Sequence, residues 1–175
     1  MNRSGFTIDA ARREEYAEVG ALMASAYAGL AGFPSRDEQP DYYAMFDDLG
    51  ALAERPQAAL VVARDGSGEL LGGVLYFGDM RHYGAGGTAR DAANASGLRL
   101  LAVEPKARGR GIGRALTLAC VERARRRGHA EILLHTTEYM SAAWALYERM
   151  GFERAVDLDF LQGTLAVRGF RLSLT

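Results

Sequence analysis

The first part of the chain reads as one strand followed by two helices. Apolar and polar residues alternate over residues 6–9, which predicts a strand, and apolar positions recur at helical spacing over residues 16–27. A second helical rhythm covers residues 43–52 and ends before Pro56, because proline lacks the amide hydrogen that a helix interior needs. We therefore expect one helix over each of these two segments.

The middle of the chain reads as a hairpin followed by a long loop. Residues 58–63 and 70–77 are apolar runs typical of strands. Segment 65–68 between them contains glycines that tolerate the positive φ angles of a tight turn. Residues 78–97 have no period and many small or polar side chains, so we expect an irregular loop of a kind that is often functional or disordered.

The remaining segments alternate strands with helices. A strand is predicted over residues 98–103, with Pro105 ending it. Its alternation places Leu98, Leu100 and Ala102 on one face and Arg99, Leu101 and Val103 on the other. The pattern then predicts a helix over 113–127, a strand over 132–135, a helix over 142–150 and closing strands over 152–156 and 167–174. This order predicts an α/β domain whose mixed sheet is covered by helices.

Composition and charge narrow the class of protein. The 175 residues are 49% hydrophobic and 25% charged, and no repeat or linker divides residues 1–175, so we expect a single domain. A formal charge of −1 gives no general attraction to nucleic acid or to a membrane surface. No apolar run approaches the roughly 20 residues that span a bilayer. With one cysteine and no secretory signal at the start, we expect a cytoplasmic location without disulfides.

The segment from Arg108 to Leu116 carries the clearest chemical signal. Glycines at 109, 111 and 113 stand between a predicted strand and a predicted helix, so backbone N–H groups can approach a ligand closely. The helix N-terminus and the arginines at 108, 110 and 114 add positive charge, which favours a pyrophosphate. The spacing matches neither the dinucleotide-binding glycine pattern nor a P-loop. The alternative is a tight turn flanked by solvated arginines.

Two motifs in this part of the chain resemble those of one known family. Leu101-Ala102-Val103-Glu104-Pro105, followed by Arg108-Gly109-Arg110-Gly111-Ile112-Gly113, resembles the acyl-CoA motif of the GNAT superfamily of N-acetyltransferases. The segment from Ala143 to Phe152 is similar to the family's Ala-x-x-x-Tyr-x-x-x-Gly-Phe ending. The resemblance implies a GNAT-like α/β fold (α+β by some schemes), with a mixed, mostly antiparallel sheet of six to seven strands flanked by about four helices.

The same resemblance implies a function and a set of site residues. It implies an N-acetyltransferase that uses acetyl-CoA as co-substrate and an amine as acceptor. Backbone groups of Leu101, Ala102 and Val103 would hold the thioester and pantetheine arm. The pyrophosphate would be held by Arg108, Gly109, Arg110, Gly111, Ile112, Gly113 and Arg114. Tyr147 would act as general acid, because a phenol stays protonated at neutral pH; the alternative is a core aromatic, since Trp144, Tyr147 and Met150 share a helical spacing.

Two departures from the family pattern leave the chemistry open. Many members carry a glutamate near the start of the strand where this chain has Ser96-Gly97, so a water chain, Asp79 or Glu138 would have to act as general base. Met140 stands where many relatives have an asparagine that contacts the cofactor. A non-catalytic acyl-CoA-binding sensor is therefore the alternative function. Homodimers are common in the family, and the oligomeric state is left open.

Other conspicuous residues are assigned no site. The arginines at 123 and 125–127 offset a helix dipole rather than bind nucleic acid, and Cys120 is expected to be a buried, inert thiol. No metal is expected, because the three histidines lack partners at ligand spacing. A weaker hypothesis concerns acidic side chains that could favour a cationic acceptor, with a solvated face as the alternative: Asp37, Glu38, Asp41, Asp47 and Asp48.

Overall fold

A central sheet of eight strands organises the computed structural model, which describes residues 5–175. The strands are β1 (Phe6–Ala10), β2 (Ala58–Asp65), β3 (Leu70–Phe77), β4 (Ala95–Val103), β5 (Glu131–Thr136), β6 (Glu153–Arg154), β7 (Phe160–Gln162) and β8 (Leu165–Ser173). The α-helices are α1 (Tyr16–Ala28), α2 (Pro40–Asp47), α3 (Leu49–Ala53), α4 (Ile112–Arg126) and α5 (Ser141–Arg149). Short 3-10 turns lie at Arg13–Glu15, Met80–His82, Ala89–Asp91, Pro105–Ala107 and Val156–Leu158.

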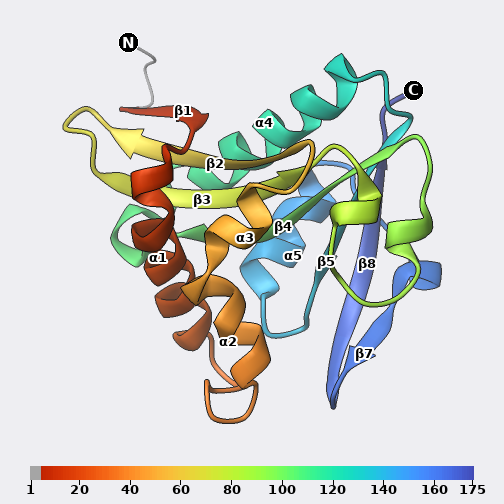
Figure 1. The fold of residues 1–175 in the computed structure, drawn as a ribbon, viewed down its shortest axis with the longest axis horizontal. Helices are drawn as coiled ribbons and strands as arrows, with labels where there is room; N and C mark the ends of the chain where they lie inside the picture. The colour runs from red at the N-terminus through yellow and green to blue at the C-terminus, as the bar shows by residue number, and fades with distance from the viewer. Residues whose placement is uncertain (1–4) are drawn as a thin grey trace.

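The order of strands in the sheet is β1-β2-β3-β4-β5-β8-β6, with β7 paired to β8 (Figure 1). Every pair is antiparallel except β4 with β5, which run parallel. A parallel pair needs a crossover connection, and α4 supplies it between these two strands. The mixed, mostly antiparallel sheet expected from the sequence is confirmed.

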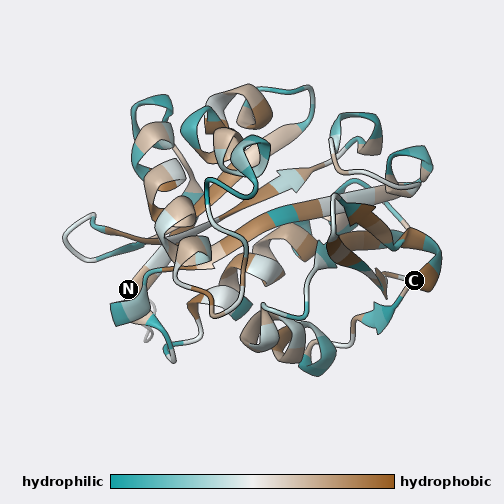
Figure 2. Cartoon of the chain, turned by 90° about the horizontal axis from the view of Figure 1, so that it is seen from below, coloured by the Kyte–Doolittle hydropathy of each residue, from teal (hydrophilic) through white to brown (hydrophobic). Residues whose placement is uncertain are grey.

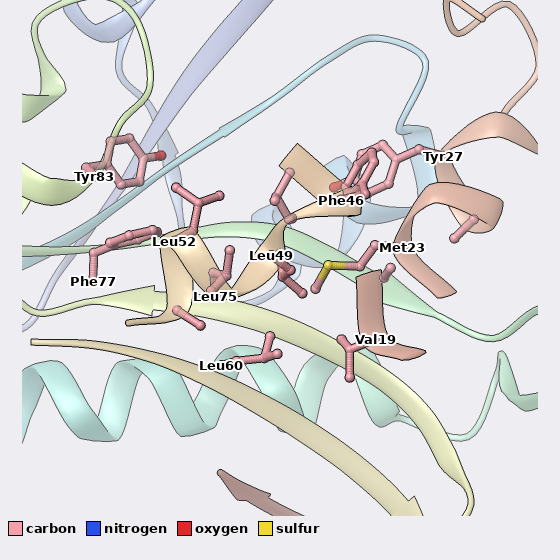
Figure 3. Packing of buried hydrophobic residues seen from close by; sticks show 14 of the residues in the cluster. Val19, Met23, Tyr27, Phe46, Leu49, Leu52, Leu60, Leu75, Phe77 and Tyr83 are labelled. Carbon is pink, nitrogen blue, oxygen red and sulfur yellow. The ribbon is translucent and has the colours of Figure 1, made fainter. Parts of the chain in front are cut away.

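Helices cover the sheet on both faces. In β2, Leu60 and Val62 pack with α1, α2 and α3, whereas Val61 and Ala63 pack with α4 on the other face. β3 is buried along its whole length for the same reason. Figure 2 shows largely hydrophobic strands between helices on either side. Figure 3 shows Met23 of α1, Leu49 of α3 and Leu75 of β3 meeting in the first of these two cores.

The prediction of one continuous helix over residues 43–52 is wrong. The structure breaks it at Asp48, where φ is −128° and ψ is 56°, and forms α2 and α3 instead. Both pieces bury their apolar residues in the same core, so the helical rhythm of the sequence continues across the break. Gly20 lets α1 pack closely on the end of α2 beside this break, because a Cβ on Gly20 would lie 2.1 Å from the carbonyl oxygen of Phe46.

The long loop expected over residues 78–97 is shorter and more ordered than predicted. It contains two 3-10 turns, and β4 begins at Ala95 rather than at Leu98. Met80, Tyr83 and Ala89 are buried, and the ring of Tyr83 packs edge-to-face on Phe77 at 5.6 Å. Contacts with distant parts of the chain order this segment, so no local period reveals it.

The C-terminal strands also differ from the prediction. The strand expected over 152–156 is only β6, followed by a 3-10 turn, and β7 was not predicted. Asp159 explains the early end, because its carboxylate accepts hydrogen bonds from the Gly169 amide at 2.7 Å and from the Arg154 guanidinium at 2.9 Å. These side-chain contacts replace strand pairing between residues that periodicity treats as one strand.

Glu15 anchors the start of α1 to the sheet. Its carboxylate accepts hydrogen bonds from Arg64 of β2 at 3.0 and 2.5 Å, and from the backbone amide of Arg12 at 2.7 Å. The Arg64 guanidinium is the largest of the influences that lower the pKa of Glu15 to about 2. Glu15 is only 5% exposed, so its charge depends on these partners.

We predict that Glu15→Gln lowers the free energy of unfolding at pH 7 by about 2 kcal/mol, because a charged hydrogen-bond network is lost. The pKa of Glu15 is lower in the folded protein than in the unfolded chain, where it is near 4.3. The carboxylate therefore contributes its full stability above about pH 4.3, and this contribution is lost as the pH falls through the pKa of the folded state. The deficit of the variant, measured by urea unfolding, should therefore shrink between about pH 4.3 and pH 2. The exposed neighbour Glu14 provides the control, since Glu14→Gln should change stability by less than about 0.5 kcal/mol. A deficit that stays constant across this pH range would contradict the assignment.

Candidate active site

The parallel pairing of β4 with β5 stops partway along both strands. Leu98 opposite Leu134 is the last pair, yet β4 continues to Val103 and β5 to Thr136. β4 also bulges where the two strands part. Its register with β3 passes from Arg99 opposite Leu75 to Ala102 opposite Gly73, so two residues of β4 stand across from Val74 alone.

Leu100 in this bulge has φ +60°, a left-handed angle that is uncommon outside glycine. The bulge overturns the predicted alternation of β4. Leu98 packs in the core beside α4, whereas Leu100 and Ala102 pack in the core beside α1, so these three residues do not share a face. A local alternation cannot show this, because the bulge depends on how β4 pairs with β3.

A cleft of about 380 Å³ opens between the separated strands. Its walls come from residues 98–103 of β4, the ends of α1 and β5, the glycine-rich turn and one side of α5. Ten of the predicted site residues line it: Leu101, Ala102, Val103, Arg108, Gly109, Gly111, Ile112, Gly113, Arg114 and Tyr147. Arg110 does not, because its guanidinium extends toward the carbonyl oxygen of Gly5 at 3.5 Å.

The glycine-rich turn has the geometry of an anion site. Gly109 and Gly111 have φ of +79° and +80°, and Gly111 is the N-cap of α4. A Cβ on either would meet nothing within 4 Å, so the backbone angle, not the available space, favours glycine there. Gly113 differs, since its Cβ would lie 3.4 Å from the Leu146 side chain across the cleft wall. The first turn of α4 thus presents backbone N–H groups that lack helical partners.

The charge around this turn is positive. Arg108, Arg114 and Arg149 line the cleft, and within residues 5–175 none of them has a carboxylate within 4.0 Å. No aspartate or glutamate is among the cleft-lining residues that the structure describes. The cleft therefore favours an anionic ligand.

Tyr147 of α5 belongs to both the core and the cleft. Its side chain is 3% exposed and packs edge-to-face on Phe152 at 5.6 Å. Its hydroxyl makes no hydrogen bond to any other described residue, and burial raises its pKa well above the usual value. The two interpretations of this residue are compatible, because a buried ring can carry a protonated hydroxyl to the cleft wall.

Several cleft residues were missed by the sequence analysis. Tyr27 at the end of α1 places its hydroxyl 3.3 Å from the carbonyl oxygen of Leu101, where it supports the bulge. Met140, which the sequence analysis did single out as a departure from the family pattern, also lies on the wall and accepts a weak hydrogen bond from Thr136 at 3.4 Å. Arg99 also lines the cleft. Tyr27 reads in the sequence as part of an ordinary apolar helix face, so periodicity cannot separate it from the core.

None of the candidate general bases lies in the cleft wall. Ser96, which stands near the position of the family's glutamate and was not itself proposed as a base, is buried, and its hydroxyl is 2.7 Å from His129 Nδ1. Asp79 is paired with Arg81, which holds the pKa of the Asp79 carboxyl at about 2. Glu138 is exposed and its carboxylate lies 3.7 Å from Arg168. A carboxylate base is therefore not positioned by this arrangement.

The other conspicuous residues are also placed. Cys120 is buried in α4, and burial raises the pKa of its thiol to about 12. Across residues 5–175, no three His, Cys, Asp or Glu side chains are grouped so that they could hold a metal ion. The described helices include none with the length and apolar character to cross a membrane. The acidic residues around α2 are exposed and line neither this cleft nor the smaller cavity beside it, and Asp47 pairs with Arg36 at 2.7 Å.

Comparison with known proteins assigns the class that this geometry suggests. The profile of the acetyltransferase (GNAT) family matches residues 23–152. The chain belongs to this family.

The curated relatives are longer proteins. The chain is 36% identical to mycothiol acetyltransferase of Salinispora tropica over 138 residues. This aligned region covers 77% of this chain and 40% of that protein. Over 55 residues it is 46% identical to mycothiol acetyltransferase of Thermobispora bispora, covering 31% of this chain and 19% of that protein. The matched parts of the chain thus cover 40% or less of the length of these two relatives.

Solved structures share the fold at low identity. A GNAT-family acetyltransferase of Staphylococcus aureus Mu50 superposes with a TM-score of 0.75 at 18% identity, covering 97% of this chain and 99% of that one. PaiA N-acetyltransferase of Thermoplasma acidophilum, solved with coenzyme A, has a TM-score of 0.72 at 16% identity over 94% and 97% of the two chains. The yncA protein of Salmonella typhimurium, solved with acetyl-CoA, has 0.67 at 18% identity over 98% and 95%.

The glycine turn generates a prediction on ligand binding. Gly111→Ala should weaken coenzyme A binding about fivefold, because alanine shifts the free turn away from the left-handed angle and ligand binding must restore it at a cost of roughly 1 kcal/mol. Gly128 is a matched control, since it has φ +74° at the far end of α4 and a Cβ placed there would meet no atom within 4 Å. Gly128→Ala should lose similar stability but keep its affinity, both measured by calorimetry. Equal affinity losses in the two variants would contradict a special role for the turn.

Proposed function

We propose that this chain is an acyl-CoA-dependent N-acetyltransferase that transfers the acetyl group of acetyl-CoA directly to an amine. The observation that carries the proposal is a single cleft whose walls include both an anion-binding glycine turn and the hydroxyl of a buried tyrosine. The family membership and the coenzyme A and acetyl-CoA complexes of structural neighbours support the same co-substrate.

The chain's own groups suit the steps of this reaction. The N-terminus of α4, with Arg108 and Arg114 beside it, binds the pyrophosphate. Among the described residues, the edge of β4 beyond Leu98 has no strand partner on the β5 side. Apart from the Leu101 carbonyl oxygen, which accepts from Tyr27, its backbone groups are free to bind the pantetheine arm and the thioester oxygen. Tyr147 donates a proton to the departing thiolate, and the proton that the attacking nitrogen loses as the amide forms returns to the Tyr147 oxygen through solvent.

The acceptor enters as a neutral amine in this mechanism. The described residues place no carboxylate in the cleft wall, and His135 is engaged at both ring nitrogens. Its Nε2 donates to the Leu158 carbonyl oxygen at 2.8 Å, so its Nδ1 accepts from the Tyr83 hydroxyl at 2.9 Å. Burial lowers the pKa of His135, which keeps the ring neutral. The solvent therefore takes the ammonium proton before attack.

The first test is a substitution of the proton donor. Tyr147→Phe should lower kcat about 100-fold and leave the Kd for acetyl-CoA unchanged, because only the donor is lost. Tyr43→Phe is the matched control. Tyr43 is 2% exposed, and its hydroxyl donates to the Pro34 carbonyl oxygen at 2.8 Å away from the cleft. Unchanged turnover of Tyr147→Phe in a chemistry-limited assay would remove the general-acid role.

The second test is the pH profile. Without a base in the cleft wall, kcat/KM should rise tenfold per pH unit up to the pKa of the acceptor's own ammonium group. Two acceptors of different basicity should then bend at different pH values, as measured by thiol release. A bend between about pH 6 and 8 shared by every acceptor would instead reveal an enzyme base.

One observation favours a second candidate, a non-catalytic acyl-CoA-binding sensor. Among the described residues, no aspartate or glutamate that could act as a general base lines the cleft. Thiol release from acetyl-CoA, measured with a panel of amines, separates the two functions. Tight binding of acetyl-CoA with no release for any amine would favour the sensor and overturn the acetyltransferase.

A further inference from the structure

A smaller cavity of about 40 Å³ adjoins the cleft. The two share part of their lining, including Tyr27, Arg99 and Met140, so they lie side by side. The remaining wall of the small cavity comes from α2, the connection after β5, and strands β7 and β8. Its volume suits a group about the size of three water molecules. We call it the side pocket.

Arg99 brings a positive charge to the side pocket without a counter-ion. Its guanidinium lies over the ring of Tyr83 at 5.6 Å and donates to the Tyr83 carbonyl oxygen at 3.0 Å. A second, weaker hydrogen bond goes to the sulfur of Met45 at 3.4 Å. In the described part of the chain no carboxylate lies within 4.0 Å of it, although Arg99 is half-buried. A half-buried cation of this kind is stabilised by an anion.

Thr137 supplies an independent observation at the same place. It lines the side pocket and is only 3% exposed, and its hydroxyl has no hydrogen-bond partner among residues 5–175. Buried polar groups are nearly always satisfied, so an orphaned hydroxyl beside a cavity indicates a missing partner. Tyr42 also lines the pocket, and its hydroxyl makes no hydrogen bond to another described residue. Arg99, Thr137 and Tyr42 thus bring three hydrogen-bond donors to the lining of the side pocket.

The neighbouring groups favour an anion over a cation. Neither the side pocket nor the cleft has a described carboxylate in its lining. His135, which lines both, is neutral and engaged at both nitrogens. A cationic side chain would therefore meet the charge of Arg99 without compensation. A planar carboxylate matches the donor fork of a guanidinium and the small volume of the pocket.

From this juxtaposition we propose that the side pocket binds a carboxylate on the acceptor, so that the preferred substrates are amines that carry a carboxylate near the amino group, as in α-amino acids. Arg99 pairs with the carboxylate, and Thr137 and Tyr42 complete its hydrogen bonds. The amino group then points from the side pocket into the cleft, where the acetyl group is delivered. This inference rests on the proposed function, because it names the acceptor class for that reaction.

The test compares each α-amino acid with its amide, which lacks the negative charge. The wild type should prefer the acid in kcat/KM by about 10- to 100-fold, the range expected for charged hydrogen bonds. Basicity alone would favour the amide, because its amino group is less basic and a larger fraction of it is neutral at a given pH. A preference for the acid therefore cannot come from the basicity of the amine. Arg99→Gln should remove this preference without changing the Kd for acetyl-CoA, and Arg99→Lys should restore part of it. Equal kcat/KM for acids and amides in the wild type would overturn the proposal.

Thr137→Val separates ligand binding from folding. The buried hydroxyl has no hydrogen-bond partner in the described part of the chain, so its removal should not lower Tm. The kcat/KM for the acids should nevertheless fall about threefold to tenfold, with little change for the amides. A lower Tm, or an equal loss for acids and amides, would assign Thr137 a structural role and count against the pocket.

A binding experiment keeps this inference distinct from the proposed reaction. The protein loaded with coenzyme A is titrated in a calorimeter with N-acetyl-amino acids and with their amides. Tighter binding of the acids, lost in Arg99→Gln, would support the carboxylate pocket even if no amine is acetylated. Equal binding of acids and amides, or no binding of either, would overturn the pocket even if acetyl transfer is found.

Discussion

The parallel pairing of β4 with β5 ends at Leu98 and Leu134, and the arrangement around the cleft depends on this end point. Past it, one edge of β4 keeps backbone groups that the sheet leaves without partners. The bulge at Leu100 and Leu101 turns the strand there, and Tyr27 supports it from α1. Unpaired backbone inside a protein is unfavourable unless a ligand or water satisfies it, so this opening is suited to bind an extended molecule.

Chain connectivity places the chemical groups on the walls of this opening. The glycine turn and α4 follow β4 directly, and α5 follows β5, so each separating strand brings its own helix to the cleft (Figure 1). The N-terminus of α4 and Tyr147 of α5 therefore face a common space. A rigid sheet, buried on both faces, holds these two helices and restricts their movement relative to each other.

The distribution of charge separates structural arginines from those of the cleft. Arg64 is paired with Glu15 and Arg154 with Asp159, and these pairs connect elements of the fold. Arg99 and Arg114 line the cleft, and neither has a carboxylate partner in the part of the chain that is described. Positive charge without an internal counter-ion attracts anions. In the proposals above, Arg114 attracts the pyrophosphate and Arg99 attracts the acceptor carboxylate.

The sequence by itself determined the features that depend on a few neighbouring residues. The positive φ angles of Gly109 and Gly111 and the start of α4 are local properties, so the turn was predicted with nearly correct bounds. Tyr147 could be named as a candidate site residue because the motif that contains it is contiguous in the sequence. Only the tertiary structure decided the bulge in β4, the break at Asp48, the packing of residues 78–97 and the meeting of Arg99 with Thr137. Those features depend on partners far away in the sequence, and periodicity along one segment does not record what that segment will pack against.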